Sequence, residues 1–323
     1  MTRADLLSRV DGLRTGRTPF VLATVVRAER PTSAKPGDCA LVLADGTIDG
    51  FVGGVCAEST VRLESLRLLQ AGESGLLRIT PRSGDSDAPD QEGVRTVGNP
   101  CLSGGTLEIF LEAMVPAALV YVHGEAPVAR ALARVGHALD WDVRPAVDPA
   151  APIPPDTSAV VVASHGRDEA AVLAAALKAG VPYVALVASR RRSAGVREEL
   201  AAMGVPEPDL ERVHAPAGLD IGARTAPEIA LTVFAEIVAH RPRVHAPEGT
   251  EPTSSGGSTG EEGSSTHVHA VEGSVEVAVD PVCGMDVAMT PASISARHGA
   301  TTVYFCGTGC RQAFLDDPQR FRT

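Results

Sequence analysis

Cys56 directly follows two glycines and a valine in the stretch GFVGGVCAES. The preceding segment LVLADGTIDGFV is typical of a strand, and the following segment VRLESLRLLQAG has apolar residues near helical spacing up to Gly72. We therefore expect Cys56 at a helix N-terminus, where backbone N–H groups and the helix dipole favour anions and lower the pKa of a thiol. Gly53 and Gly54 would let a ligand approach the backbone closely. This arrangement suits a ligand that carries a phosphate or a metal, and the alternative is a small buried cysteine.

Two more residues are candidates for the same site. Cys101 lies beside glycines in GNPCLSGG, and it either joins Cys56 as a second thiol or packs in the interior. Glu58 either contacts the ligand or stabilises the first turn of the helix electrostatically. We assign Cys39, in GDCALVLADG, to packing.

Three cysteines near the C-terminus form a separate pattern. Cys283 lies in DPVCGM, and Cys306 and Cys310 lie in VYFCGTGC. Two thiolates one short turn apart and a distant third can converge on one soft metal ion, which would add folding energy to a small module. The alternative is three reduced core cysteines without a metal. A fourth ligand is not evident from the spacing, although His298 is a candidate.

A glycine-rich loop precedes a long apolar helix in HAPAGLDIGARTAPEIALTVFAEIVAHR. Thr225 and Glu228 have the T-x-x-E spacing of a capping box. Gly218, Asp220 and Gly222 either face a ligand or form a tight connection, because sites commonly lie at the C-terminal edge of a parallel sheet.

From residue 118 onward, apolar runs alternate with helical patterns, which predicts a parallel sheet covered on both faces, as in Rossmann-like domains. A dinucleotide fingerprint would start at Gly124, with Asp148 as the ribose-binding acid. However, its second glycine position holds Ala126, followed by Pro127, so a structural turn is favoured over nicotinamide binding. The inward stripe of the first helix is predicted to consist of Val128, Leu132, Val135 and Leu139.

Composition excludes several classes of function. The 323 residues have a formal net charge of -11, which argues against a nucleic-acid partner. We expect no transmembrane segment, because the longest apolar runs fall far short of the roughly 20 residues that a membrane helix needs. The first residues lack the apolar core of a signal peptide, so we expect a cytoplasmic protein whose six cysteines are reduced.

Several of these motifs, in this order, resemble the XdhC/CoxI family: GFVGGVCAES, NPCLSGGTLEIFLE, VASHGRDEAAVLAAAL, PYVALVASRRR and HAPAGLDIGARTAPEIALTVFAEIV. The GG-x-C-x-E spacing looks more like the CoxI-type branch. The resemblance implies a molybdenum hydroxylase accessory protein that binds molybdenum cofactor (molybdopterin), supports its sulfuration and delivers it to an apo-molybdenum hydroxylase. Xanthine dehydrogenase and aerobic carbon monoxide dehydrogenase are the implied clients. The implied cofactor-binding residues are Gly53, Gly54, Cys56, Glu58, Cys101, Gly218, Asp220 and Gly222.

The C-terminal residues resemble the YHS/TRASH family, with DPVCGM, YFC, GC and AFLDDPQRF in place. That resemblance implies zinc or copper bound by Cys283, Cys306 and Cys310. The Gly-, Ser- and Thr-rich stretch before this module cannot bury a core and is interpreted as a flexible linker.

The expected class is α/β, with an N-terminal α+β cofactor domain, a Rossmann-like parallel-sheet domain and a small metal-stabilised C-terminal module. The predicted segments are an XdhC/CoxI-like cofactor-binding domain at 1–115, a Rossmann-like domain at 116–244, the linker at 245–274 and a YHS/TRASH-like domain at 275–323.

We interpret the protein as a maturation and insertion chaperone rather than a turnover enzyme. A cysteine desulfurase as sulfur donor follows from the resemblance, and a homodimer is compatible with it. Two other hypotheses about the function stay open. An NAD(P)-dependent oxidoreductase predicts saturable nucleotide binding, and a metal-responsive scaffold predicts metal uptake without a pterin.

Overall fold

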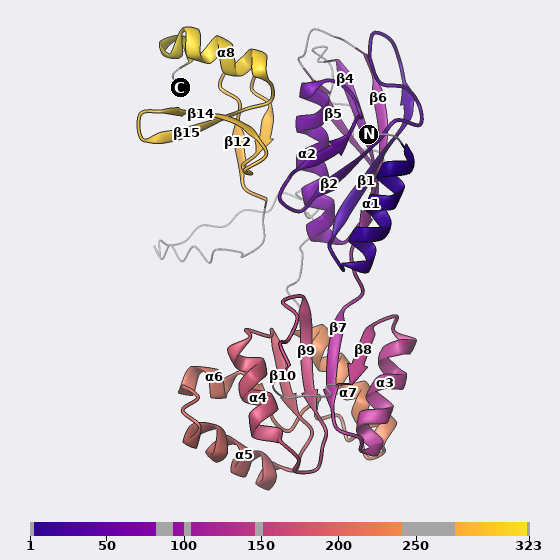
Figure 1. Ribbon diagram of the computed structural model, residues 1–323, viewed down its shortest axis with the longest axis vertical. Helices are drawn as coiled ribbons and strands as arrows, with labels where there is room; N and C mark the ends of the chain where they lie inside the picture. Colours follow the sequence, from indigo (N-terminus) through magenta and orange to yellow (C-terminus); the bar gives the residue numbers. More distant parts are fainter. Residues whose placement is uncertain (1–2, 82–92, 100–104, 146–150, 241–274, 322–323) are drawn as a thin grey trace, which may run out of the picture. The chain divides into compact units, whose positions relative to one another are not determined.

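The computed structural model describes residues 3–81, 93–99, 105–145, 151–240 and 275–321. The chain divides into two compact units (Figure 1). The first unit comprises Met1–Pro116 together with Val244–Thr323, and the second comprises Ala117–Arg243.

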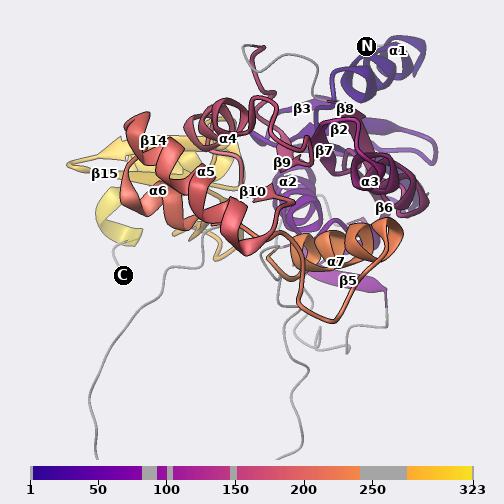
Figure 2. The same ribbon diagram turned by 90° about the horizontal axis from the view of Figure 1, so that it is seen from below.

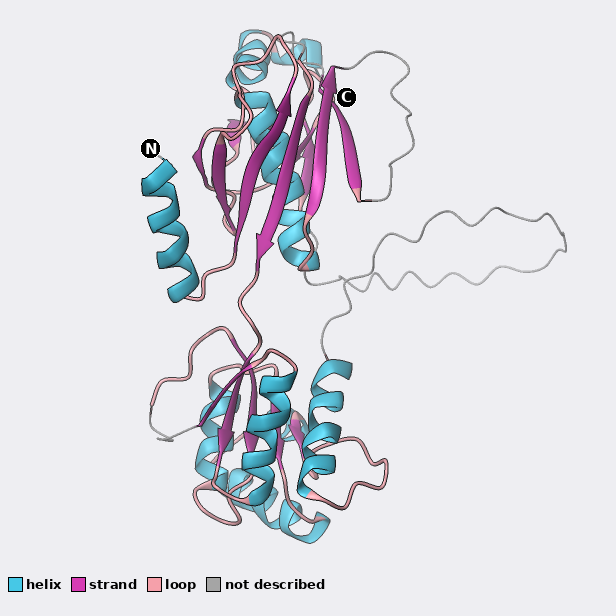
Figure 3. Cartoon of the chain, turned by 90° about the vertical axis from the view of Figure 1, so that its right-hand side faces the viewer, coloured by secondary structure: helices cyan, strands magenta, loops and turns pink. Residues whose placement is uncertain are grey.

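A six-stranded sheet with the order β3-β2-β1-β6-β4-β5 forms the centre of the first unit. All its neighbouring strands pair antiparallel except β4 and β5, which are parallel. The long helix α2 packs on one face of this sheet (Figure 3). The elements are α1 (Arg3–Thr15), β1 (Phe20–Ala28), β2 (Cys39–Leu43), β3 (Ile48–Gly50), α2 (Val55–Ala71), β4 (Gly75–Pro81), β5 (Val94–Asn99) and β6 (Leu107–Met114).

Strand β6 shows why the sheet forms. Leu107, Ile109 and Leu111 are buried as predicted, because alternate residues of a strand point to the same face. The segment 41–52, expected as one strand, instead forms a hairpin of β2 and β3. Its turn contains Gly46 at φ +83°, a left-handed conformation that glycine adopts without strain.

The C-terminal residues of the first unit form two small antiparallel pairs and one helix. Val287 and Met285 are buried in their small core together with Cys306. Strand β13 contacts α2, where Ala288 packs against Leu63 and Leu66. The elements are β12 (Val277–Val279), β13 (Asp286–Ala288), β14 (Ile294–His298), β15 (Thr301–Phe305), α8 (Thr308–Asp316) and the short 3₁₀ helix η1 (Pro318–Phe321).

The second unit is a parallel sheet of order β11-β10-β9-β7-β8, covered by helices on both faces (Figure 2). This confirms the predicted Rossmann-like class. One core lies under α3 and α7, and the other lies under α4 and α5. The elements are β7 (Leu119–His123), α3 (Pro127–Ala138), β8 (Asp142–Pro145), β9 (Thr157–Val162), α4 (Glu169–Lys178), β10 (Tyr183–Leu186), α5 (Arg190–Ala202), α6 (Glu207–Glu211), β11 (Val213–His214) and α7 (Ala226–Ala239).

The predicted inward stripe of α3 is wrong at its last residue. Leu132 is fully buried, and Val128 and Val135 pack against the same core. Leu139 is 45% exposed, because the helix ends at Ala138 and Leu139 is its C-cap.

Two other expectations concern the second unit and the whole chain. Asp148, the candidate ribose-binding acid, lies outside the described residues. No helix in the described ranges combines the length and the apolarity that crossing a bilayer requires.

Candidate functional site

Cys56 is the second residue of α2, as the sequence predicted. Gly54 is the N-cap and has an ordinary extended conformation. Gly53 has φ +141°, and a Cβ there would lie 3.1 Å from the Cβ of Ala57. Gly53 therefore shapes the turn that leads into the helix, whereas a Cβ on Gly54 would meet no atom within 4 Å.

A cavity of about 330 Å³ opens in front of the α2 N-terminus. Its wall also includes the N-terminus of α8, which begins after Gly307. Two helix N-termini thus face one cavity, and each favours negative charge through its N–H groups and its dipole. The lining residues are Pro31, Thr32, Gly54, Val55, Cys56, Ala57, Ile79, Pro81, Asn99, Gly105, Leu107, Gly307, Thr308 and Gly309.

Gly54 and Cys56 line this cavity, but Gly53 and Glu58 are not among its lining residues. Burial raises the pKa of Glu58, and attraction to Arg62 opposes the shift. Burial also lowers the pKa of Arg62, whose Nε donates to the Gly46 carbonyl at 2.7 Å. The structure thus gives Glu58 a partner on the next turn of α2.

The three C-terminal cysteines predicted as metal ligands lie together. The Sγ atoms of Cys283 and Cys306 are 3.5 Å apart, and those of Cys306 and Cys310 are 3.7 Å apart. One carboxylate oxygen of Asp280 and these three Sγ atoms all lie within 4.8 Å of one another. Spacing alone had not indicated Asp280, which is fully buried.

Asp280 holds the backbone around the thiols. Its Oδ1 accepts from the Val282 N–H at 2.9 Å, and its Oδ2 accepts from the Cys306 N–H at 2.8 Å. The side chain therefore fixes Cys283 and Cys306 at a common centre, because it bonds the backbone beside each of them.

The pKa values of the thiols in this cluster shift in different directions. A hydrogen bond from Cys306 lowers the pKa of Cys283, and the same bond raises the pKa of Cys306. Burial raises the pKa of Cys310 to about 12. Of the three thiols, Cys283 is thus the one whose deprotonation the cluster favours.

Cys56 lies beside this cluster. Its side chain packs against the core formed by Met285, Val287 and Cys306. A Cβ on Gly307 would lie 3.5 Å from the Cys56 Sγ. The motif around Cys56 and the three-cysteine motif, which we interpreted as two separate sites from the sequence, are therefore neighbours. No one-dimensional signal connects residues so far apart in the chain.

The other two cysteines of the first unit contribute differently. Cys101 lies outside the described residues. Cys39 is half-buried, its thiol donates to the Gly37 carbonyl at 3.2 Å, and it packs near α1. Its surroundings agree with a packing role.

The turn after β7 has a structural reason for its glycine. Gly124 has φ +122°, and a Cβ there would lie 2.3 Å from the Ala163 carbonyl oxygen. Ala126 is the N-cap of α3, and Pro127 occupies the first helical position. Pro127 removes one N–H from the helix end at which a pyrophosphate would bind.

The loop before α7 combines packing and exposed positions. Gly218 has φ +97°, a Cβ there would lie 2.4 Å from the Thr232 Oγ1, and its N–H donates to Glu236 at 2.7 Å. Asp220 has an 89% exposed side chain, 3.7 Å from Arg190. Gly222 has φ +83° and open space around its Cβ position. Gly218 thus forms a tight connection.

The predicted capping box of α7 is confirmed. Thr225 is the N-cap, and its N–H donates to the Glu228 carboxylate at 2.9 Å. Backbone hydrogen bonds from Thr225 and Arg224 lower the pKa of Glu228.

The second unit contains a buried polar network around Glu236 that we did not predict from the sequence. The Tyr183 hydroxyl donates to Glu236 at 2.5 Å, and Nδ1 of His214 lies 3.2 Å from the same carboxylate. Burial raises the pKa of Glu236, but these hydrogen bonds and that of Gly218 outweigh it, so the net pKa is lowered. His240 lies close enough to complete a cluster of possible metal ligands with His214 and Glu236.

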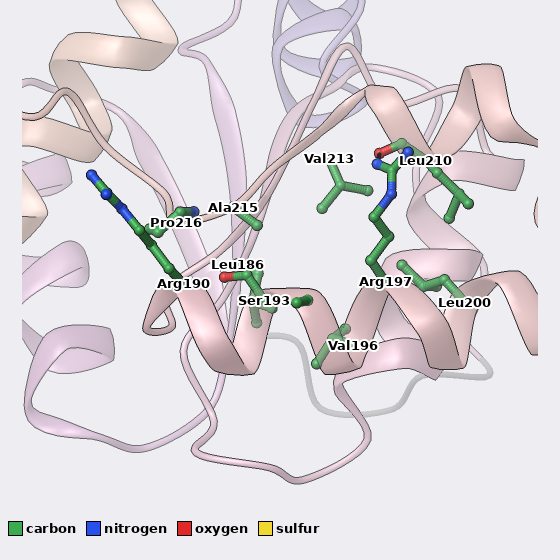
Figure 4. Close-up of a pocket in the computed structure, with 11 residues that line it drawn as sticks. Leu186, Arg190, Ser193, Val196, Arg197, Leu200, Leu210, Val213, Ala215 and Pro216 are labelled. Carbon is green, nitrogen blue, oxygen red and sulfur yellow. Dashed lines mark hydrogen bonds between the residues drawn. The ribbon is translucent and has the colours of Figure 1, made fainter.

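A second cavity, of about 380 Å³, lies along α5 (Figure 4). Its wall is mostly apolar, and Arg190 and Arg197 reach from α5. Arg197 donates to the Leu210 carbonyl at 3.1 Å and thereby ties α5 to α6. The lining residues are Leu186, Arg190, Ser193, Ala194, Val196, Arg197, Leu200, Leu210, Val213, Ala215 and Pro216.

Fold and site define a two-unit α/β protein with a thiol-bearing cavity in one unit and a parallel dinucleotide-type sheet in the other. Comparison with family models agrees. A model described as the XdhC and CoxI family matches residues 13–80, and one described as the XdhC Rossmann domain matches residues 120–237. Over these segments, the chain is similar to the XdhC and CoxI family. The matches end at residue 237, so the YHS/TRASH resemblance stays a prediction.

Two curated proteins of Escherichia coli (strain K12) are similar to the chain. The uncharacterized protein YqeB is 29% identical over 246 residues, which cover 68% of this chain and 43% of YqeB. The chain thus spans less than half the length of that relative. The molybdenum cofactor insertion chaperone PaoD is 23% identical over 283 residues, or 74% of this chain and 88% of PaoD.

One solved structure is described as a xanthine dehydrogenase from Bacillus halodurans. It is 17% identical and has a TM-score of 0.35, with 76% of this chain and 98% of that chain covered.

Proposed function

We propose that this protein binds molybdenum cofactor and inserts it into an apo-molybdenum hydroxylase. The observation that carries the proposal is the position of Cys56, in a cavity lined by the N-termini of α2 and α8. The similarity to PaoD supports the same function.

The residues present fit such a ligand. The cavity volume of about 330 Å³ lies within the range of small-molecule sites. The helix N-termini would hold the phosphate of the pterin, and Gly54 leaves its backbone accessible. Cys56 would contribute a soft sulfur ligand to molybdenum or carry a persulfide during sulfuration. When bound, the cofactor would supply the redox chemistry of the client enzyme.

The finer parts of the proposal concern partners and the remaining residues. The client is xanthine dehydrogenase or an aerobic carbon monoxide dehydrogenase, and a cysteine desulfurase supplies sulfur. Cys101, Asp220 and Gly222 stay candidate cofactor-binding residues, and homodimer formation and a cytoplasmic location stay predictions. We do not propose an NAD(P)-dependent oxidoreductase, because Pro127 weakens the phosphate site of α3.

A second function, metal binding by the C-terminal residues, is favoured by the geometry of the cysteine cluster. The three thiols of Cys283, Cys306 and Cys310 suit zinc or copper(I), both of which accept thiolate ligands. On this proposal, residues 275–323 form a YHS/TRASH-like module.

The test of the main proposal measures pterin fluorescence and molybdenum content of protein purified anaerobically from a cofactor-producing host. We expect cofactor in the wild type and its loss in Cys56→Ala, because the variant removes the thiol at the cavity wall. Cys39→Ala is the matched control and should retain the cofactor. Absence of cofactor from the wild type, with the fold intact by circular dichroism, would contradict the proposal.

A further inference from the structure

The proposed metal site has three thiols, but tetrahedral structural zinc sites have four ligands. The fourth donor must come from a group close to Cys306, because Cys306 contacts both Cys283 and Cys310. Two groups lie beside Cys306. One is the carboxylate of Asp280, with an oxygen within 4.8 Å of the three Sγ atoms, and the other is the thiol of Cys56, which packs against the core that contains Cys306.

Asp280 stabilises the backbone around the three thiols. Both of its carboxylate oxygens accept backbone hydrogen bonds, from Val282 at 2.9 Å and from Cys306 at 2.8 Å. A carboxylate oxygen is also a harder ligand than a thiolate, whereas a site with three thiolates selects a soft metal ion. Asp280 therefore positions the thiols and is the weaker candidate for the fourth ligand.

Cys56 offers the fourth sulfur ligand that the three-cysteine metal site lacks. It adds a soft sulfur to three others, and its Sγ would lie 3.5 Å from a Cβ on Gly307, the residue that follows Cys306. It also packs against the same small core as Cys283 and Cys310.

The surrounding backbone favours the charge of such a site. A zinc ion with four thiolates carries a net charge of about -2. The first turns of α2 and α8 both border this region, and their dipoles stabilise negative charge.

We infer that Cys56, Cys283, Cys306 and Cys310 together bind one soft metal cation, zinc or copper(I), in a four-thiolate site that joins α2 to the C-terminal residues. Metal binding releases a proton from each cysteine that is still a thiol. The filled site occupies the Cys56 thiol, which also lines the cavity. Together with the proposed function, this means that metal and molybdenum cofactor compete for the Cys56 thiol.

The first experiment titrates Co²⁺, as a spectroscopic substitute for zinc, into the metal-free, reduced full-length protein. The intensity of sulfur-to-cobalt charge-transfer absorption reports the number of thiolate ligands. We expect four thiolates in the wild type and a fall of about one quarter in Cys56→Ser, since one of four ligands is lost. Cys39→Ser, in which a first-unit cysteine outside the cluster is replaced, should match the wild type.

Zinc affinity gives a second readout, from competition with a chromophoric chelator. Cys56→Ser should weaken zinc binding by at least about tenfold, because even ligand-supporting residues contribute 10- to 100-fold. The serine hydroxyl of Cys56→Ser is itself a weak zinc ligand, so Cys56→Ala, which has no donor atom, is measured as well. Unchanged absorption and affinity in both variants would overturn the four-thiolate site and leave the three-cysteine site standing.

A third measurement separates this inference from the proposed function. Wild-type protein, metal-free or loaded with zinc, is exposed to isolated molybdenum cofactor, and the bound pterin is quantified. Binding only to the metal-free form is the expected result. Equal binding to both forms would overturn the competition but keep the chaperone function, whereas binding to neither would contradict the chaperone function and leave the cobalt result unaffected.

Discussion

Gly53 and Gly54 are neighbours in sequence but differ in what they contribute. Gly53 is held at φ +141°, and a Cβ there would crowd Ala57 at 3.1 Å and Leu107 at 3.2 Å. Gly54 has φ -71° and faces open space within the cavity wall. Stability therefore depends on Gly53, and access to the cavity depends on Gly54.

We predict that Gly53→Ala lowers the free energy of unfolding by about 1–3 kcal/mol, the usual range for a residue forced into a disfavoured conformation. Gly54→Ala should change stability by less than about 0.5 kcal/mol, as is usual for exposed substitutions, but should reduce cofactor content because the methyl group enters the cavity. Urea unfolding followed by circular dichroism measures the first effect, and pterin analysis measures the second. Equal stability of the two variants would contradict this assignment.

At the scale of elements, helix α7 is fixed to the parallel sheet through one carboxylate. Glu236 accepts hydrogen bonds from Tyr183 on β10 and from the N–H of Gly218, and it pairs with His214 on β11. Its side chain is only 13% exposed. The network lets a charged group sit against the core, because buried carboxylates need several donors.

Glu236→Gln should therefore destabilise the second unit near pH 7 by about 1–3 kcal/mol. The folded pKa of Glu236 lies below its ordinary value of 4.5, so its contribution is present above pH 4.5 and is lost as the pH falls through the folded pKa. The stability difference between wild type and variant should accordingly shrink below pH 4.5.

Fluorescence of Trp141, the single tryptophan of the chain, can follow this unfolding. Its ring lies edge-on to Phe234 of α7, at a centroid distance of 5.1 Å. The exposed Glu199 on α5 provides the control, and Glu199→Gln should leave the pH profile unchanged. A pH-independent difference between wild type and Glu236→Gln would refute the role given to the carboxylate.

At the scale of the whole molecule, the first unit is assembled from both ends of the chain. The N–H of Val275 donates to the Gln70 side chain at 3.1 Å, and Ala288 packs on α2. The second unit has its own cores beneath the helices on each face of its sheet. Binding in the first unit should therefore leave the second unit unchanged.

We predict that one equivalent of zinc, which the thiol cluster takes up before the His214–Glu236–His240 group, slows amide exchange in α2 and in residues 283–310 in hydrogen-exchange mass spectrometry. Amide exchange in residues 117–240 should stay the same as without zinc. The physical reason is linkage, since a ligand at about 100 times its Kd stabilises the folded state by about 2.7 kcal/mol. The Trp141 unfolding transition should not move with zinc. Protection limited to residues 283–310, without α2, would show that the metal does not involve Cys56.

Much of this architecture could be predicted from local patterns. The alternation in β6, the start of α2 at Val55 and the capping box of Thr225 and Glu228 follow from rules that operate within a few residues. The exposed Leu139 was missed because helical periodicity does not say where the last turn ends.

The sequence by itself determined the parallel-sheet class and the chemical identity of each thiol, because periodicity and residue type are properties of a short segment. The tertiary structure alone decided that Cys56 lies beside Cys306, that Asp280 holds the thiol cluster, and that two helix N-termini line one cavity. The first and third of these contacts join segments more than two hundred residues apart, and Asp280 bonds the N–H of Cys306 across 26 residues. They depend on how β13 and α8 pack near α2, which no local pattern encodes.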